Sequence, residues 1–190
     1  MRIREIIPEA SPDTPEGSVS RDLMQSKLWL CKTLQELTLT KFDNIYILGS
    51  WYGALALIIK RLDFGYHNIY CVDSDREKAS YFANLVDQHN LQGIHSVCEP
   101  AEDLHYRGRD ILVINTSTND ITGVAWLDQV PSGSVVAIQG RNNQAQSNGI
   151  ETLDDFDAEY PLEQTFVVDS ITVTGVDGQA YRRFMKIGRR

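Results

Sequence analysis

The residues best suited to chemistry stand where short apolar runs end. The run over 44–48 stops at Gly49, and Gly53 opens the next apolar stretch four residues later. Such a turn lets a ligand approach bare backbone and directs helix N–H groups toward anionic atoms. Asp73 ends a second β-branched run, where a carboxylate can accept hydrogen bonds from both hydroxyls of a ribose. Together, the glycine turn and the strand-end acid favour a nucleoside cofactor.

An alternating series of strands and helices must position these residues. Apolar runs predict strands over 44–48, 68–72, 94–98, 110–114 and 134–139. Helical periodicity predicts helices over 20–39, after Gly53, around 79–86, over 121–130 and near 152–159. This order predicts an α/β fold, a Rossmann-like doubly wound sheet that is mostly parallel. The turn Val176–Gly178 lies between two alternating runs and predicts a C-terminal antiparallel hairpin.

The chain length of 190 residues fits one domain. Residues 1–19 are polar, aperiodic and rich in proline, so we expect an extended arm there and a single domain over 20–190. No apolar run approaches the roughly 18 residues of a membrane span, and the arm lacks the apolar core of a secretory signal. We therefore expect a cytoplasmic protein.

Charge and cysteine content exclude further classes. The formal net charge is −8, which disfavours a nucleic-acid partner because phosphate tracking needs clustered positive charge. A basic group near the C-terminus keeps nucleic acid as a minor alternative, although a solvated strand face is the simpler interpretation; it comprises Arg182, Arg183, Lys186, Arg189 and Arg190. The widely spaced Cys31, Cys71 and Cys98 match no metal-ligand spacing, and we expect all three to be small buried apolar residues.

The glycine turn itself distinguishes between cofactors. A dinucleotide fingerprint needs glycine at its third position, where the pyrophosphate touches backbone. That position holds Trp51, and the sixth holds Ala54. The bulk of Trp51 argues against NAD or FAD.

Over residues 40–190 the sequence resembles the class I S-adenosylmethionine-dependent methyltransferases. The resemblance rests on the loop Gly49–Gly53, on Asp73, on the acidic segment Pro100–Asp103 and on the segment Asn115–Thr118. It implies S-adenosylmethionine as cofactor and methyl transfer to an unidentified acceptor. Because no appreciable extra domain for a large substrate is evident, we expect a small molecule, or a macromolecular site reached with help from a partner. The resemblance also implies cofactor contacts at Gly49, Ser50, Trp51, Gly53, Asp73, Ser74, Ala101, Glu102 and Asn115. The helix around Ser20–Leu34 also resembles small methyltransferase-like proteins of tailed phages.

Three positions depart from the family pattern. Ile47 stands where the family has an acid, Trp51 replaces the middle glycine, and Asn115 lacks the prolines that follow it in many amine methyltransferases. Two alternatives therefore stay open. One is a cofactor-binding protein that has lost methyl transfer, and the other is an NAD-linked or nucleotide-sugar enzyme of similar fold.

Polar side chains after the fourth strand are the catalytic candidates, since ligands bind at the carboxyl ends of strands in open parallel sheets. Asn115 and Ser117 could orient an acceptor amine or hydroxyl, and Asp120 is the nearest candidate base. Alternatively, Asn115 and Ser117 cap the following turn, and Asp120 caps a helix beginning at Ile121.

Other polar residues are expected at the same edge of the sheet or over it. Asn119 follows the fourth strand, and the fifth strand ends in Gln139, Arg141 and Asn142. Lys27 and Trp29 on the first helix could cover the cofactor, or could remain a solvated lysine and a packed tryptophan.

Overall fold

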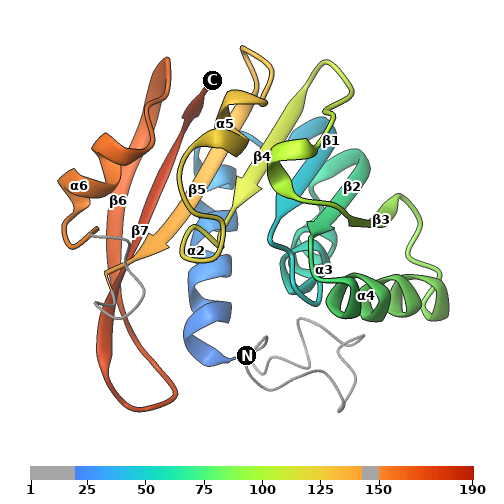
Figure 1. The fold of residues 1–190 in the computed structure, drawn as a ribbon, viewed down its shortest axis with the longest axis horizontal. Helices are drawn as coiled ribbons and strands as arrows, with labels where there is room; N and C mark the ends of the chain where they lie inside the picture. Colours follow the sequence, from blue (N-terminus) through green and yellow to red (C-terminus); the bar gives the residue numbers. More distant parts are fainter. Residues whose placement is uncertain (1–19, 143–149) are drawn as a thin grey trace.

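A single mixed sheet organises the chain, seen in a computed structural model that describes residues 20–142 and 150–190. Its strands lie in the order β3-β2-β1-β4-β5-β7-β6 (Figure 1). The first five strands pair in parallel, and β7 pairs antiparallel with β5 and β6. Their bounds are β1 Lys41–Leu48, β2 Gly65–Asp73, β3 Ile94–Cys98, β4 Ile111–Asn115, β5 Val135–Arg141, β6 Gln164–Thr174 and β7 Ala180–Arg189. The doubly wound, mostly parallel sheet with a terminal antiparallel hairpin is as the sequence predicts.

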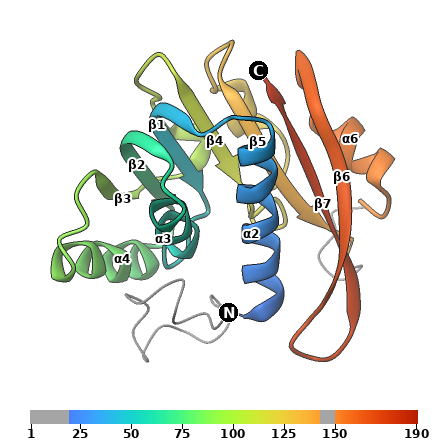
Figure 2. The ribbon, with the colours of Figure 1, turned by 180° about the vertical axis from the view of Figure 1, so that it is seen from behind.

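Helices cover both faces of the sheet, which explains why its central strands are apolar throughout. One face carries α2 (Arg21–Glu36), α3 (Ala54–Arg61) and α4 (Arg76–Gln88), which stand in front in Figure 2. The other carries η2 (Ala101–Asp103), α5 (Ala125–Asp128) and α6 (Leu153–Glu159). Two hydrophobic clusters result, one containing Leu30 and Leu34 of α2 and the other Trp126 and Phe156.

Local sequence signals fix where several helices begin. Asp75 caps α4, and its carboxylate accepts the backbone N–H groups of Glu77 and Lys78. Thr152 and Asp155 form a reciprocal capping box at α6. Both helices thereby satisfy N–H groups that have no partner within the helix.

Three expectations about the elements need correction. The helix predicted over 121–130 is confined to α5, because Gly123 has a φ of +73°, which interrupts a helical path before Ala125. Asp120 therefore caps no helix at Ile121. Cys98 is exposed, whereas Cys31 and Cys71 are buried as expected.

The basic group near the C-terminus is solvated only in part, since Arg182 and Arg189 are exposed but Arg183 and Lys186 are buried. Strand alternation sends Arg183 to one side of the sheet and Lys186 to the other, where they are 3% and 4% exposed. Lys186 pairs with Asp157. The predicted arm over 1–19 lies outside the described residues. Within the part of the chain that the structure describes, no helix is long and apolar enough to cross a bilayer.

Candidate functional site

Strand order places the site between β1 and β4. The sheet is built outward in two directions from these neighbours, so their carboxyl ends diverge into loops on opposite faces, which opens a crevice at that edge. The last residue of β1, Leu48, lies beside Asn115, the last of β4. The glycine turn 49–53 and the polar segment 116–120 consequently face each other across the crevice.

Close packing explains why this turn requires glycine. Gly49 has a φ of +56°, and a Cβ there would lie 2.6 Å from the Ser117 Cβ. Gly53 has a φ of +75°, and a Cβ there would lie 1.9 Å from the Phe82 ring. The Ser117 hydroxyl donates to the Gly49 carbonyl at 2.9 Å. The two loops are therefore in direct contact, with no space for a side chain between them.

Trp51 occupies the remaining left-handed position of the turn, with a φ of +52°. This region costs a non-glycine residue about 1–2 kcal/mol. Trp51 N–H donates to the Asp73 carboxylate at 2.8 Å, and the Lys78 ammonium lies 5.2 Å from the centre of the indole ring. These two contacts hold the tryptophan in a conformation that glycine adopts without cost.

Asp73 is 7% exposed at the end of β2. One carboxylate oxygen accepts Trp51 N–H, and the other accepts Asp75 N–H at 3.0 Å. An ionised carboxylate offers about four acceptor positions, so it can accept further donors after both backbone bonds are made. Asp73 thus joins the glycine turn to α4 and still presents an acceptor to a ligand.

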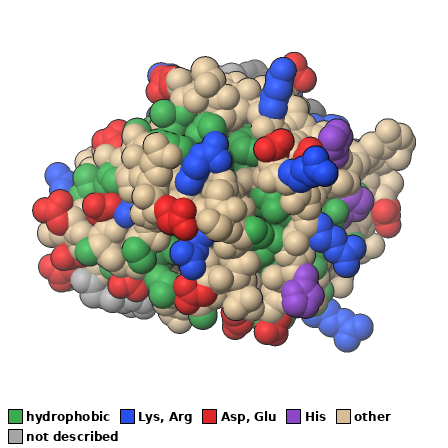
Figure 3. Space-filling view, turned by 90° about the horizontal axis from the view of Figure 1, so that it is seen from above, with side chains coloured by type: hydrophobic (Ala, Val, Ile, Leu, Met, Phe, Trp, Pro, Cys, Tyr) green, Lys and Arg blue, Asp and Glu red, His purple; other side chains and the backbone are tan. Residues whose placement is uncertain are grey.

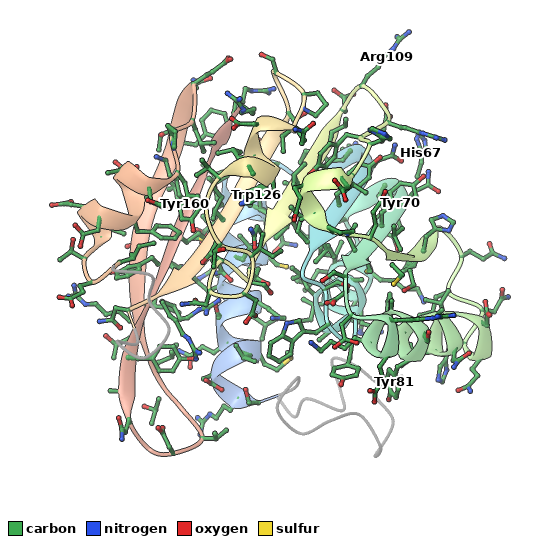
Figure 4. The ribbon with its side chains drawn as sticks, in the orientation of Figure 1. His67, Tyr70, Tyr81, Arg109, Trp126 and Tyr160 are labelled. Carbon is green, nitrogen blue, oxygen red and sulfur yellow. The ribbon has the colours of Figure 1, made fainter. Side chains whose placement is uncertain are left out.

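The first of two adjoining cavities, the acidic cavity, has a volume of about 610 Å³ and extends from Gly49 over Asp73 to Ala101 and Trp126. Figure 4 shows Trp126 between α5 and the sheet. Its ionisable lining consists of the carboxylates of Asp73, Asp75, Glu99, Glu102 and Asp120 and the ammonium of Lys78. Negative charge therefore dominates this cavity.

The second, the basic cavity, has a volume of about 240 Å³ and lies on the other side of Gly49, Trp51 and Asp120, which line both. Its cations are Lys27 of α2, Arg141 of β5 and Arg183 of β7. Its walls also include Leu23, Ile47, Ser50, Tyr52, Leu55, Thr116, Ser117 and Asn119. Positive charge therefore dominates this cavity, although the chain as a whole is acidic.

A buried polar cluster holds α2 against this cavity. The Ser26 hydroxyl donates to the Gln139 side-chain oxygen at 3.0 Å, and the Gln139 amide donates to the Ser26 carbonyl at 3.1 Å. Arg183 Nε donates to the Ser26 hydroxyl at 3.1 Å. Gln139 is fully buried, so it positions α2 and is not in contact with a ligand site. From α2, Leu23 and Lys27 line the cavity, whereas Trp29 packs against the core.

Burial changes the acidity of the two cations nearest this cluster. Burial and the neighbouring Arg183 lower the pKa of Lys27 to about 8. Burial and Arg141 lower the pKa of Arg183 to about 10, with Tyr181 acting in the opposite direction. At pH 7 both groups are predominantly charged.

The predicted catalytic residues occupy different positions. Asn115 is fully buried, and its side-chain oxygen accepts Ser117 N–H at 2.9 Å, which is the turn-capping alternative. Its amide nitrogen has no hydrogen-bond partner in the described part of the chain. Ser117 lines the basic cavity, and exposed Asp120 lines both.

Most predicted cofactor contacts share the two cavities. Gly49 and Trp51 line both, Ser50 lines the basic one, and Asp73, Ser74, Ala101 and Glu102 line the acidic one. Within the described residues, Gly53 and Asn115 line neither, and both act behind the wall through packing and turn capping.

Arg183 is the cavity residue that sequence reasoning missed. Strand alternation could have found it, since Arg183, Met185 and Ile187 lie two residues apart and all three are buried. Asn142, predicted at this edge, instead accepts Arg182 N–H through its side chain.

The opposite edge of the sheet shows no comparable separation of charge. Seen from above in Figure 3, acidic and basic side chains are interspersed there. His67 and Arg109 lie at this edge, far from the cavities (Figure 4). The described ranges contain no group of three or more His, Cys, Asp or Glu side chains placed to hold a metal ion.

Comparison with known proteins agrees on the fold. No family model and no curated sequence matches the chain. Among solved structures, a Pyrococcus horikoshii protein assigned as an RNA methyltransferase matches with a TM-score of 0.64 and 16% identity, over 100% of this chain and 95% of its own. An O-methyltransferase from Bacillus cereus in complex with S-adenosylhomocysteine matches with a TM-score of 0.61 and 16% identity, over 99% and 90%. The chain has the fold of the class I methyltransferases.

A third structure with this methyltransferase fold is the N-methyltransferase NodS from Bradyrhizobium japonicum. It matches with a TM-score of 0.63 and 11% identity, over 91% of this chain and 98% of its own. The three neighbours are named for different acceptors, RNA among them. The shared fold therefore does not identify the acceptor, which depends on the side chains that line the site.

Proposed function

We propose that the protein transfers a methyl group from S-adenosylmethionine to an acceptor bound in the basic cavity. The observation that carries this function is the acidic cavity, in which Asp73 ends β2 beside the glycine turn and Ala101–Glu102 forms the far wall. Carboxylates at this position suit the hydroxyls of a ribose. The methyltransferases of the same fold support the assignment.

The charge of the acidic cavity favours this cofactor over a dinucleotide. A pyrophosphate would bring two negative charges into a lining that already holds five carboxylates, and Lys78 already lies over Trp51 and beside Asp75. An adenosyl group with a cationic sulfonium has the complementary charge. The Trp51 N–H is also committed to Asp73, so the turn offers less bare backbone to a phosphate than a glycine would.

The cofactor supplies a methyl group whose bond to sulfur breaks as the acceptor atom bonds to its carbon, the electron pair remaining on sulfur. The residues of this chain bind and orient the two reactants, which is the main requirement of such a transfer. Asp73 and Glu102 would hold the ribose, and Ser74 and Ala101 would border the adenine. Gly49, Trp51 and Asp120 line both cavities, so the reacting atoms would meet at this boundary, with Ser117 and Asn119 on the acceptor side.

Calorimetry tests the cofactor assignment directly. S-adenosylhomocysteine should bind one site per chain, and at 100 times its Kd it should stabilise the fold by about 2.7 kcal/mol. NAD should give no heat. Tight NAD binding without S-adenosylhomocysteine binding would favour a dinucleotide enzyme.

Product formation separates an enzyme from a binding protein. Mass spectrometry should detect S-adenosylhomocysteine formed from S-adenosylmethionine when a mixture of small acceptors is supplied. Cofactor binding without any methylated product from candidate acceptors would instead favour a binding protein, in line with the departures at Ile47 and Trp51.

A further inference from the structure

The three cations of the basic cavity are only partly neutralised by nearby carboxylates. Among the described residues, Lys27, Arg141 and Arg183 form no salt bridge. Asp120 lines the same cavity and is exposed. Asp22 acts on Lys27 and Arg183 through its charge, and its carboxylate, which also accepts the Tyr181 hydroxyl at 2.6 Å, offsets part of their positive charge. The cavity therefore retains an excess of positive charge.

The pairing of β5 with β7 makes this excess of positive charge unusual. Arg141 and Arg183 are direct cross-strand partners in the antiparallel pairing of β5 with β7. Like charges in that position destabilise a sheet, and an uncompensated buried charge costs more than an exposed one. Arg183 is 3% exposed, with hydrogen bonds to the Ser26 hydroxyl and the Thr116 carbonyl. The Arg141 guanidinium lies 5.9 Å from the centre of the Tyr181 ring, so both arginines have local partners, but none of these partners is a carboxylate.

A bound anion would offset the repulsion between the two guanidinium groups and the cost of burying their charge. Guanidinium groups bind carboxylates and phosphates through paired N–H donors, and an ammonium adds a further charge-assisted bond. The cofactor carries a single carboxylate together with an ammonium, so this part of it adds no net negative charge to the cavity. The remaining positive charge calls for a second anion.

We propose that the basic cavity binds a carboxylate or phosphate group of the methyl acceptor, which would make the acceptor a small acidic molecule. This inference rests on the proposed function, since it assigns the acceptor of that same reaction. Leu23, Ile47 and Leu55 also line this cavity, which suits an apolar body on that molecule. The volume of about 240 Å³ is below the range of drug-sized ligands, about 300–1,000 Å³.

Calorimetry on the protein loaded with S-adenosylhomocysteine tests the inference. Benzoate and phenyl phosphate are the anionic probes, and benzamide is the neutral match. At least one anion should bind tenfold or more tightly than benzamide, and the comparison of the two identifies the preferred oxyanion. Arg183→Gln, Arg141→Gln and Lys27→Met should each weaken the anion at least tenfold. If neither anion binds better than benzamide while S-adenosylhomocysteine still binds, the inference is overturned and the proposed function stands.

Matched variants control for charge and folding. Arg182→Gln removes an exposed charge from the residue next to Arg183, and Lys32→Met removes an exposed charge one turn and a half along α2 from Lys27. Both should leave anion affinity within twofold. If Arg183→Gln fails to fold, Lys27→Met and Arg141→Gln test the same prediction from other elements, and normal anion affinity in both would overturn it.

A cofactor comparison separates the acceptor's anion from the cofactor's own carboxylate. S-adenosylhomocysteine and 5′-methylthioadenosine share the nucleoside, but only the former has a carboxylate. In the Lys27→Met and Arg141→Gln variants, the ratio of the affinities for S-adenosylhomocysteine and 5′-methylthioadenosine should change less than threefold. A tenfold loss confined to S-adenosylhomocysteine would assign the cations to the cofactor and overturn the inference. Absence of S-adenosylhomocysteine binding in the unaltered protein would overturn the proposed function and, with it, the acceptor assignment.

Discussion

The acidic and basic cavities meet at Gly49, Trp51 and Asp120, and they differ in both charge and origin. Four of the five carboxylates of the acidic lining, Asp73, Asp75, Glu99 and Glu102, come from the segments that end or follow β2 and β3, close together in the chain. The basic lining joins Lys27, Arg141 and Arg183, which α2, β5 and β7 bring together from distant positions. Cavities of opposite charge on two sides of one wall favour different ligands. The acidic cavity repels anionic groups, and the basic cavity repels cationic groups.

The largest effect should follow a change in the shared wall. Gly49→Ala adds a Cβ 2.6 Å from the Ser117 Cβ at a φ of +56°, which should destabilise the fold by about 3 kcal/mol through backbone strain and overpacking. Gly133→Ala is the control, because Gly133 has a φ of +83° with nothing within 4 Å of the added atom. It should cost about 1 kcal/mol. Urea unfolding measures both, and equal losses would show that the two loops are not tightly packed.

Asp73→Asn should weaken ligand binding in the acidic cavity and leave binding in the basic cavity unchanged. Charge-assisted hydrogen bonds to ribose contribute roughly 1.5–3 kcal/mol each, so S-adenosylhomocysteine affinity should fall at least tenfold. Benzoate affinity should change less than twofold. Asp87→Asn, an exposed charge on α4, is the control in the same titration. Because Asp73 also accepts the N–H groups of Trp51 and Asp75, a loss of stability with unchanged affinity would reduce its role to the turn.

The pH dependence should distinguish the basic cavity from the acidic one. Lys27, with a pKa lowered to about 8 by burial and Arg183, loses its charge above that pH. The pKa of Arg183, about 10, keeps its guanidinium charged over this range. Burial raises the pKa of the Cys31 thiol to about 12, and the lowered pKa of Asp22 keeps its carboxylate ionised. Benzoate affinity should therefore decline several-fold between pH 7 and pH 9. Lys27→Met should give a flat profile over that range, and calorimetry at both values checks each.

Unfolding cannot produce this decline. The folded pKa of Lys27 is below its ordinary 10.5, so the unfolded chain binds more protons between about pH 8 and 10.5. The free energy of unfolding contributed by Lys27 therefore rises with pH in that window. Weaker binding at pH 9 together with undiminished stability is the combination expected.

The smallest effect should come from Asp75→Ala, at the edge of the acidic cavity. Loss of the N-cap bonds to Glu77 and Lys78 should lower Tm by about 2–4 °C. The bond to Lys78 N–H and other local donors lower the pKa of Asp75 below 3.8, so the difference from the unaltered protein should shrink as the pH falls through that lowered value. S-adenosylhomocysteine affinity should change less than threefold, and a larger change would place the Asp75 carboxylate against the cofactor.

The same contrast explains how much the sequence predicts. The glycine turn and Asp73 belong to strand–loop units whose local pattern indicates both structure and position, and the family resemblance added Ala101–Glu102 after the third strand. The parallel strands and the terminal hairpin follow from apolar runs and the Asp177–Gly178 turn in the same way. The observed strand bounds differ from the predicted ones by a few residues. For example, β1 begins at Lys41, before the apolar run that starts at residue 44.

The basic cavity depends on pairing between distant segments, which a local pattern does not contain. The register that sets Arg141 opposite Arg183 arises only when β7 inserts between β5 and β6. Likewise, the burial of Asn115 and the short α5 depend on the contact of the 116–120 segment with Gly49. The sequence predicted Asn115 and Arg141 at this edge of the sheet, but it did not predict Arg183 there or the contacts among the three.

The Ser26 cluster has a consequence for the folding pathway. Its bonds join residues 113 and 157 positions apart, and contacts of such separation form slowly because long loops must close first. The acidic cavity, assembled from neighbouring units, can exist before α2 docks on the sheet. Recovery of anion binding after dilution from denaturant should therefore lag behind recovery of nucleoside binding, which makes the basic cavity a reporter for the final stage of refolding.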